Sequence, residues 1–383
     1  MFLKTIIISV LLLALVVSFG LVTDSRAAFK LEQAPIKQVQ IPDELDGLLG
    51  SNEIISEAQF KEEIKNSRQA YFSGRTFYVD GNRPYSGNGQ SPEKALKTIE
   101  EAVEVASQGD VIVVMGACVY QLDDLIRPRP DVHFYFYDTA YVISPQDRPA
   151  FLFDYHESAS KKYTFFWGGK FLGNRGNESG IIIDRSHKFI LSNIYFVGQI
   201  PGTNLQPLEF GLKTNFANQI YITNSAFAYA NEGVRVGMGY QDKLEFTNNV
   251  FDHNKRGITL SGMMASQVDV VNNAFKDNDY GIYSIVEQYS MRPRIKISYN
   301  GYHGVADNFS HHEPGHYFAE VYESAGNKFQ DPYFKNGSWY KLRADSLYRD
   351  AGDPGIRDRN GTRSDIGIHG GPYNFCKWPL QQL

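Results

Sequence analysis

Apolar and polar residues alternate in short runs that recur along the middle of the chain. The runs IYITNSAF (220–227), LEFTNNVF (244–251) and VDVVNNAF (268–275) follow one another at steps of 24 residues. An apolar residue at every second position predicts a strand with one buried face. Looser copies of the same run occupy 165–171, 189–196 and 295–302. No helical period fits this region, so it predicts stacked turns of about three short parallel strands each, a β-solenoid, and excludes helical repeats.

Equivalent positions in the repeat predict what each turn does with its side chains. Phenylalanines end the three runs and are expected to stack inside the coil. Asparagines at the preceding corner favour a left-handed turn and hydrogen bonds to their equivalents on the next turn. Glycines also recur at the 24-residue step; the residue after each is expected inside and the next one outside. These positions are Phe227, Phe251 and Phe275; Asn224, Asn248 and Asn272; and Gly233, Gly257 and Gly281.

The first 27 residues have the pattern of a targeting segment. An apolar run at 6–22 follows Lys4 and precedes small residues, which predicts a signal peptide cleaved after Ala27. The alternative is an uncleaved membrane anchor, since the run is close to the length that spans a bilayer. Residues 28–75 form a separate segment with short, charged helical stretches.

A second helix is expected at the start of the solenoid. Ser91 before Pro92 is an N-cap pattern with proline at the first helical position. The residues Ala95, Ile99 and Ala102 then recur on one face of that helix. We expect the apolar stripe to cover the otherwise open end of the coil, because uncovered turns expose sheet edges.

The composition narrows the class of protein. The chain contains 34 glycines, 24 tyrosines and 26 phenylalanines, which favours strands joined by tight turns. A formal net charge of −5 with no basic block argues against a nucleic-acid partner. Two cysteines, Cys118 and Cys376, exclude a disulfide scaffold. Whether they pair or remain buried thiols is left open.

Three stretches together resemble the right-handed parallel β-helix proteins of the pectate-lyase-like superfamily. They are the opening TFYVDGNRPYSGNGQSPEKALKTIEEAVEVASQGDVIVVMGACVY, the 24-residue ladder, and the tail NKFQDPYFKNGSWYKLRADSLYRDAGDPGIRDRNGTRSDIGIHGGP. The resemblance covers about 76–371. It implies an all-β fold, with a right-handed parallel β-helix of about ten rungs over 76–325. An irregular C-terminal cap or tail is expected over 326–383.

The resemblance also implies an extended polysaccharide in a groove along an outer sheet. The residues two positions after the repeat glycines form one outward column: Lys213, Arg235, Thr259 and Tyr283. Lys213 and Arg235 would be neighbours that bind one sugar carboxylate, with Arg256 beside them and Tyr283 against a sugar face. The alternative is a solvated face with an exposed basic pair. Insertions at 199–207 and 287–294 are expected to form walls of the site.

Two further groups carry candidate chemistry. His253 and Asp277 are 24 residues apart and should stack on adjacent turns, as do Lys255 and Asp279. A carboxylate beside an imidazole suits general acid–base catalysis, although such pairs are also common in surface turns.

A histidine-rich stretch near the end of the repeats contains His303, Asp307, His311, His312, Glu313 and His316. It matches no established metal motif, so we predict no metal site there, and a polar loop is the simpler interpretation. No cofactor is implied with certainty, and a bound calcium is left open.

These observations favour a secreted or periplasmic protein that binds an acidic polysaccharide. Whether it also cleaves the polysaccharide is left open; the reaction favoured for an enzyme is lyase-like β-elimination. Lys213 and Arg235 would neutralise the uronate carboxylate and His253 would remove the C5 proton. A glycoside hydrolase is less favoured because no diagnostic carboxylate pair is evident; the nearest acids are Asp277, Asp279 and Glu287. The alternative is a non-catalytic surface or periplasmic β-helix that binds glycan or protein. No stable membrane insertion is expected after signal cleavage.

Overall fold

The structure is a computed structural model, and it describes part of the chain. The described residues are 56–67, 70–155, 162–173, 180–185, 188–198, 208–216, 219–237, 239–261, 263–285, 294–311, 320–335 and 340–371. The chain divides into two compact units, Met1–Asp43 and Glu44–Leu383, and every described residue belongs to the second. The expected signal peptide therefore lies outside the described residues and remains a prediction.

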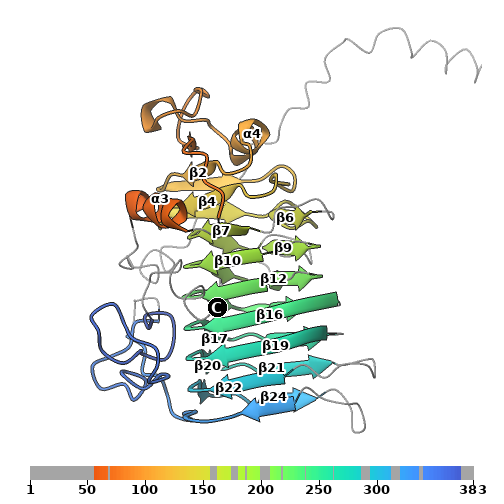
Figure 1. Cartoon of the computed structure of the whole chain (residues 1–383), viewed down its shortest axis with the longest axis vertical. Helices are drawn as coiled ribbons and strands as arrows, with labels where there is room; N and C mark the ends of the chain where they lie inside the picture. Colours follow the sequence, from red (N-terminus) through yellow and green to blue (C-terminus); the bar gives the residue numbers. More distant parts are fainter. Residues whose placement is uncertain are drawn as a thin grey trace, which may run out of the picture. The chain divides into compact units, whose positions relative to one another are not determined.

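Three parallel sheets wind around one core (Figure 1). Sheet A contains β1 (Thr76–Val79), β2 (Val111–Val114), β4 (His133–Phe136), β7 (Tyr163–Trp167), β10 (Lys188–Ser192), β13 (Gln219–Thr223), β16 (Gly239–Thr247), β19 (Met263–Val271), β22 (Arg294–Ser298) and β25 (Glu320–Glu323). Sheet B contains β3 (Cys118–Gln121), β5 (Ala140–Ile143), β8 (Lys170–Leu172), β11 (Tyr195–Val197), β14 (Ala226–Ala228), β17 (Val250–Asp252), β20 (Ala274–Lys276) and β23 (Gly301–His303). Sheet C contains β6 (Phe151–Asp154), β9 (Ile181–Asp184), β12 (Leu208–Asn215), β15 (Ala230–Val236), β18 (Arg256–Ser261), β21 (Tyr280–Ile285) and β24 (Asp307–His311).

The 24-residue step sets the pairing register of the strands. Ile220 pairs with Leu244, and Leu244 pairs with Val268, so equivalent residues of successive turns lie directly above one another. The predicted parallel β-solenoid is confirmed. Sheet A has ten strands in the described chain but sheet C has seven, so fewer turns are complete than the ten expected.

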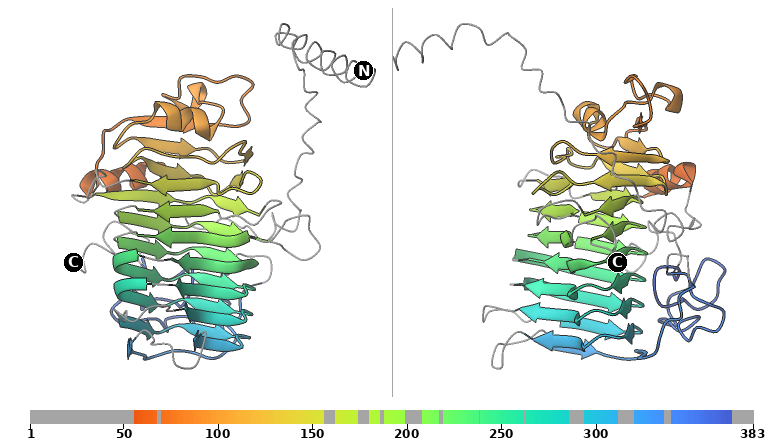
Figure 2. Two further views of the ribbon diagram at one scale, coloured as in Figure 1. Left: turned by 90° about the vertical axis from the view of Figure 1, so that its right-hand side faces the viewer. Right: turned by 180° about the vertical axis from the view of Figure 1, so that it is seen from behind.

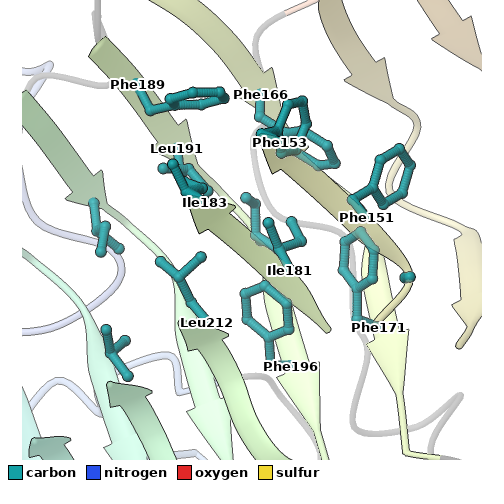
Figure 3. Close-up of a cluster of buried hydrophobic side chains, with 14 of the residues drawn as sticks. Phe151, Phe153, Phe166, Phe171, Ile181, Ile183, Phe189, Leu191, Phe196 and Leu212 are labelled. Carbon is teal, nitrogen blue, oxygen red and sulfur yellow. The ribbon is translucent and has the colours of Figure 1, made fainter. Parts of the chain in front are cut away.

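The core is a column of aromatic rings. Phe227 lies 5.1 Å from Phe251, and Phe251 lies 4.9 Å from Phe275, with the rings nearly parallel. All three are buried, as predicted. Nearer the N-terminal end the column widens into the cluster of phenylalanines that Figure 3 shows, with Phe171 and Phe196 continuing the stack.

The repeat glycines are required by close packing. A Cβ atom on Gly233 would lie 2.7 Å from the carbonyl oxygen of Gly257 and 3.0 Å from two phenylalanine side chains. After this glycine Val234 enters the core and Arg235 points outward, as the spacing predicts.

The corner asparagines behave only partly as predicted. Asn224, Asn248 and Asn272 adopt the left-handed backbone, with φ of 47°, 57° and 58°. They do not form the ladder between turns. That ladder is made one residue later, where Asn249 Nδ2 donates to Asn273 Oδ1 at 2.9 Å. The side chains of Asn224, Asn248 and Asn272 instead point away from the coil at this corner and bind the C-terminal segment.

The C-terminal segment, defined here as residues 327–335 and 340–371, packs beside the coil (Figures 1 and 2). Asn224 Nδ2 donates to the carbonyl oxygens of Ile368 and Gly370 at 2.8 and 2.7 Å. Asn248 Nδ2 donates to the Asp365 carbonyl at 2.8 Å, and Asn272 Oδ1 accepts from the Asp353 N–H at 2.6 Å. The segment is irregular, as expected, and it binds three successive turns along one corner.

The helices cover an end and a face of the coil. The expected helix from Ser91 is divided into η1 (Pro92–Lys94) and α4 (Ile99–Val105), and α4 starts at a capping box on Thr98. The predicted apolar stripe of α4 joins the core.

Before the first strand, α3 (Glu57–Asn66) packs Phe60 and Ile64 on the outer face of sheet A. None of the described helices is long and apolar enough to cross a membrane.

His133 is a buried histidine on the outer face of sheet A. Its Nε2 lies 2.5 Å from the Tyr71 carbonyl oxygen, and its Nδ1 accepts from the Phe165 N–H at 3.2 Å. These contacts require a neutral ring with the proton on Nε2. Burial lowers the pKa of His133 to about 4.

The aromatic column gives the first prediction. Phe251→Ala should lower the free energy of unfolding by about 3–5 kcal/mol, because it opens a cavity between two stacked rings. Phe216→Ala is the control, since Phe216 is 49% exposed, and it should cost less than about 0.5 kcal/mol. Urea unfolding of both variants measures the difference. Equal costs would mean that Phe251 does not support the core.

His133 gives a pH prediction. The unfolded chain binds a proton near pH 6.5 and the folded chain near pH 4, so stability is full above that window and is lost as the pH falls through it. His133→Gln removes this titration. Relative to the variant, wild type should lose up to about 3 kcal/mol between pH 7 and 4. Parallel pH profiles of the unfolding free energy would contradict the assignment.

Candidate functional site

The predicted basic column lies on the outer face of sheet C. Lys213 pairs in register with Arg235, Arg235 with Thr259, and Thr259 with Tyr283. Lys213 and Arg235 are partly exposed, but Thr259 is 0% and Tyr283 6% exposed. Thr259 and Tyr283 thus present less surface to a ligand than the sequence suggested. Tyr283 is buried because the guanidinium of Arg256 covers its ring, at 4.3 Å from the ring centre.

A buried carboxylate holds both arginines. Glu232 Oε1 accepts from Arg256 Nη1 at 2.8 Å and lies 3.6 Å from Arg235 Nη1. Glu232 was not predicted as a site residue. Its spacing could have identified it, because Glu232 precedes Arg256 by the 24-residue step and the two are partners in register.

An aromatic ring lies under the two cations of the column. Lys213 Nζ and Arg235 Cζ each lie 5.3 Å from the centre of the Phe210 ring, close enough for cation–π contact. The Glu232 carboxylate offsets one of the three charges of Lys213, Arg235 and Arg256. Within the described residues Lys213 forms no ion pair, so its ammonium is the group best able to accept an anion.

Two stacked carboxylates lie one turn away. Asp154 pairs in register with Asp184, and Arg185 contacts both, at 3.1 and 3.8 Å. Burial raises the pKa of Asp184, while Arg185 and Lys213 oppose the rise. Because Arg185 bridges the pair, these carboxylates resemble an ion-pair cluster more than the acid and nucleophile of a hydrolase.

The second predicted group lies at the corner between β17 and β18. His253 Nδ1 lies 2.7 Å from Asp252 Oδ1, and His253 Nε2 lies 3.7 Å from Asp277 Oδ2. The structure therefore brings His253 and Asp277 together on adjacent turns. Tyr229 stacks on the imidazole at 4.9 Å from the turn before. Lys276 contacts Asp277 directly and lies 3.8 Å from Asp252.

The charges around His253 favour its protonated form. The hydrogen bond that His253 donates to Asp252 raises the pKa of His253, burial and the Lys276 charge oppose this, and Asp277 adds to the rise. Asp252 is buried and therefore fixes the ring orientation, leaving Nε2 toward the partly exposed Asp277. Sequence reasoning found His253 and Asp277 but missed Asp252 and Lys276.

Three residues of the same corner could each offer one ligand atom to a metal ion. One ligand atom each from Asp252, His253 and Asp277 lies within 4.8 Å of the others. The ammonium of Lys276 already contacts both carboxylates and offsets one of their two charges, and calcium prefers six to eight oxygen ligands. These residues do not fit a calcium ion, and we assign no step to one.

The remaining candidates are only partly described. His303 Nε2 lies 3.5 Å from Asp331 of the C-terminal segment, while Asp307 is exposed on β24. His312, Glu313, His316, Glu287, Cys376 and the two insertions lie outside the described residues. Cys118 is a buried free cysteine in the described part of the chain.

Comparison with known proteins agrees with the coil. Residues 168–309 match the family model described as the right handed beta helix region. Together with the three parallel sheets, this match shows that the fold is a right-handed parallel β-helix.

Among solved structures, the chain is similar to pectate lyase Pel9A, with 14% identity, a TM-score of 0.33, and coverage of 80% of this chain and 99% of that chain. A likeness of this size carries no information about activity. No curated protein matches the chain in sequence.

The contacts of Glu232 with two arginines on the outer face of sheet C give a stability prediction. Glu232→Gln removes the charge that two arginines share in a buried place, and should lower the free energy of unfolding by about 1–3 kcal/mol. Glu209→Gln on the same strand system is the control, because Glu209 contacts only Asn231 among described side chains, at 2.6 Å. Urea unfolding compares the two. An effect no larger than that of the control would mean that Glu232 does not organise the arginines.

Proposed function

We propose that this β-helix binds an acidic polysaccharide along the outer face of sheet C, at a secreted or periplasmic location. The observation that carries the proposal is the adjacency of Lys213 and Arg235 in one outward column of sheet C. A uronate carboxylate can accept hydrogen bonds from both cations, since residues paired on neighbouring strands lie about 4.8 Å apart. The remainder of the chain carries a net negative charge, so this face is distinctive.

The proposed chemistry is β-elimination. In this reaction a cation neutralises the uronate carboxylate and acidifies the C5 hydrogen, a base accepts the C5 proton, the C5 electron pair forms the C4–C5 double bond, and the C4–O bond breaks. The carboxylate and C5 belong to one sugar, and His253 lies at the β17–β18 corner six residues before Thr259, the register partner of Arg235. His253 in its neutral form therefore serves as base for a sugar bound at that corner and not for the sugar bound by Lys213 and Arg235. The leaving oxygen takes a proton from an acid, for which water or Lys276 is available. Because the pKa of His253 is raised, the rate should increase as the pH rises through that pKa.

A non-catalytic role is the second candidate, and one observation favours it. Both Arg235 and Arg256 are engaged by Glu232, so the face resembles a preorganised binding surface more than a site with mobile catalytic groups. Incubation with pectate and alginate separates the two roles. Unsaturated ends, detected by ultraviolet absorbance, indicate a lyase, and binding without them indicates a glycan-binding protein.

The binding test uses a double variant. Lys213→Ala with Arg235→Ala should weaken binding to pectate or alginate by roughly tenfold or more, because two charge-assisted contacts are lost. The loss should shrink as salt rises, since exposed charges are screened over about 8–10 Å. Isothermal titration at two salt concentrations, with a neutral glucan for comparison, measures this.

The matched control removes two exposed lysines elsewhere. Lys94→Ala with Lys97→Ala changes the net charge equally but lies on the segment before α4. It should leave binding nearly unchanged. If both double variants lose the same affinity, general charge and not this column attracts the glycan. If neither does, the site is wrong.

A further inference from the structure

The C-terminal segment reaches the corner that contains His253. Tyr340 lies in this segment, and its hydroxyl donates to Asp252 Oδ2 at 3.0 Å. The other oxygen of the same carboxylate accepts from His253 Nδ1 at 2.7 Å. Asp252 is therefore held from both sides, by a residue far away in the sequence and by its own neighbour.

The anchoring of the segment makes this contact part of the architecture. Asn224, Asn248 and Asn272 bind its backbone on three successive turns, as described above. Asp331 of the same segment lies 3.5 Å from His303, which follows Asp252 and Lys276 down one column of sheet B. The segment thus approaches this column at more than one place.

We propose that Tyr340 is a positioning residue for the His253 acid–base group, and that the C-terminal segment completes this site. By fixing the Asp252 carboxylate, Tyr340 holds the imidazole with Nδ1–H on Asp252 and Nε2 toward Asp277. The inference rests on the proposed function for its catalytic meaning, but the arrangement of Tyr340, Asp252 and His253 can be tested without any glycan.

The charged and titratable groups that face the imidazole set the expected sign. They are Asp252, Lys276, Asp277, Tyr229 and Tyr340, with Asp331 acting on Lys276. The Tyr340 hydroxyl stabilises the Asp252 anion. Without that hydrogen bond the carboxylate is a stronger partner for the imidazolium, so the pKa of His253 should rise.

The experiment follows the His253 imidazole by NMR in the full chain as pH is varied. Tyr340→Phe should raise the His253 pKa by about half a unit. Tyr333→Phe is the matched control, because Tyr333 belongs to the same segment but is exposed, and it should leave the pKa unchanged. An unchanged pKa in folded Tyr340→Phe overturns the proposal.

A double-mutant cycle shows whether Tyr340 acts through Asp252. Asp252→Asn should lower the His253 pKa, and Tyr340→Phe should add nothing in that background. An equal effect of Tyr340→Phe in both backgrounds would overturn the proposed route. If Tyr340→Phe does not fold, the wild-type protein provides the test. The NMR chemical shift of Tyr340 Cζ should then change over the same pH range in which His253 titrates. A Cζ chemical shift that stays constant over that range also overturns the proposal.

The same variants keep this inference separate from the proposed function. If wild type cleaves a uronate polysaccharide, the pH–rate profile of Tyr340→Phe should move with the measured His253 pKa, with KM little changed. If wild type binds no glycan but the pKa shift is found, the proposed function fails and the positioning role stands. If glycan is cleaved without the shift, the positioning role fails alone.

Discussion

The exact superposition of one turn on the next is the constraint on which this structure depends. In a parallel β-helix each side chain contacts the equivalent side chains of the turns above and below, so its size and conformation must suit theirs. Phe227, Phe251 and Phe275 satisfy this by stacking flat rings at about the strand spacing. The outer face obeys the same rule, which is why Lys213 lies beside Arg235 and Glu232 beside Arg256.

What the sequence could predict follows from this constraint. Contacts between residues one repeat apart are visible as spacing, so the coil, the aromatic core, the basic column and the His253–Asp277 pair could all be inferred before the structure. The pairing of Glu232 with Arg256 has the same 24-residue spacing and was predictable in the same way. The start of α4 was misplaced because two candidate caps, Ser91 and Thr98, compete and only packing of Ile99 into the core selects one.

Contacts that cross between the coil and a non-repeating segment have no such signature. Tyr340 is 88 residues from Asp252, and Ile368 is 144 residues from Asn224. The first separation is not a multiple of the 24-residue repeat, and the second equals six repeats in number only, because the irregular segment contains no copy of the repeat from which a register could be derived. The burial of Tyr283 was unpredictable for a related reason, since it depends on where the side chain of Arg256 lies across the face.

The lateral attachment of the C-terminal segment also changes how the coil should come apart. A solenoid held only by nearest-neighbour contacts can lose its terminal turns one at a time. Here one stretch of chain is tied to Asn224, Asn248 and Asn272, so the outermost of these turns cannot detach without releasing a segment that also holds the inner two. This couples local opening across three turns, and gives a repeat architecture a block of cooperative, all-or-none behaviour at the part of the coil where His253 lies.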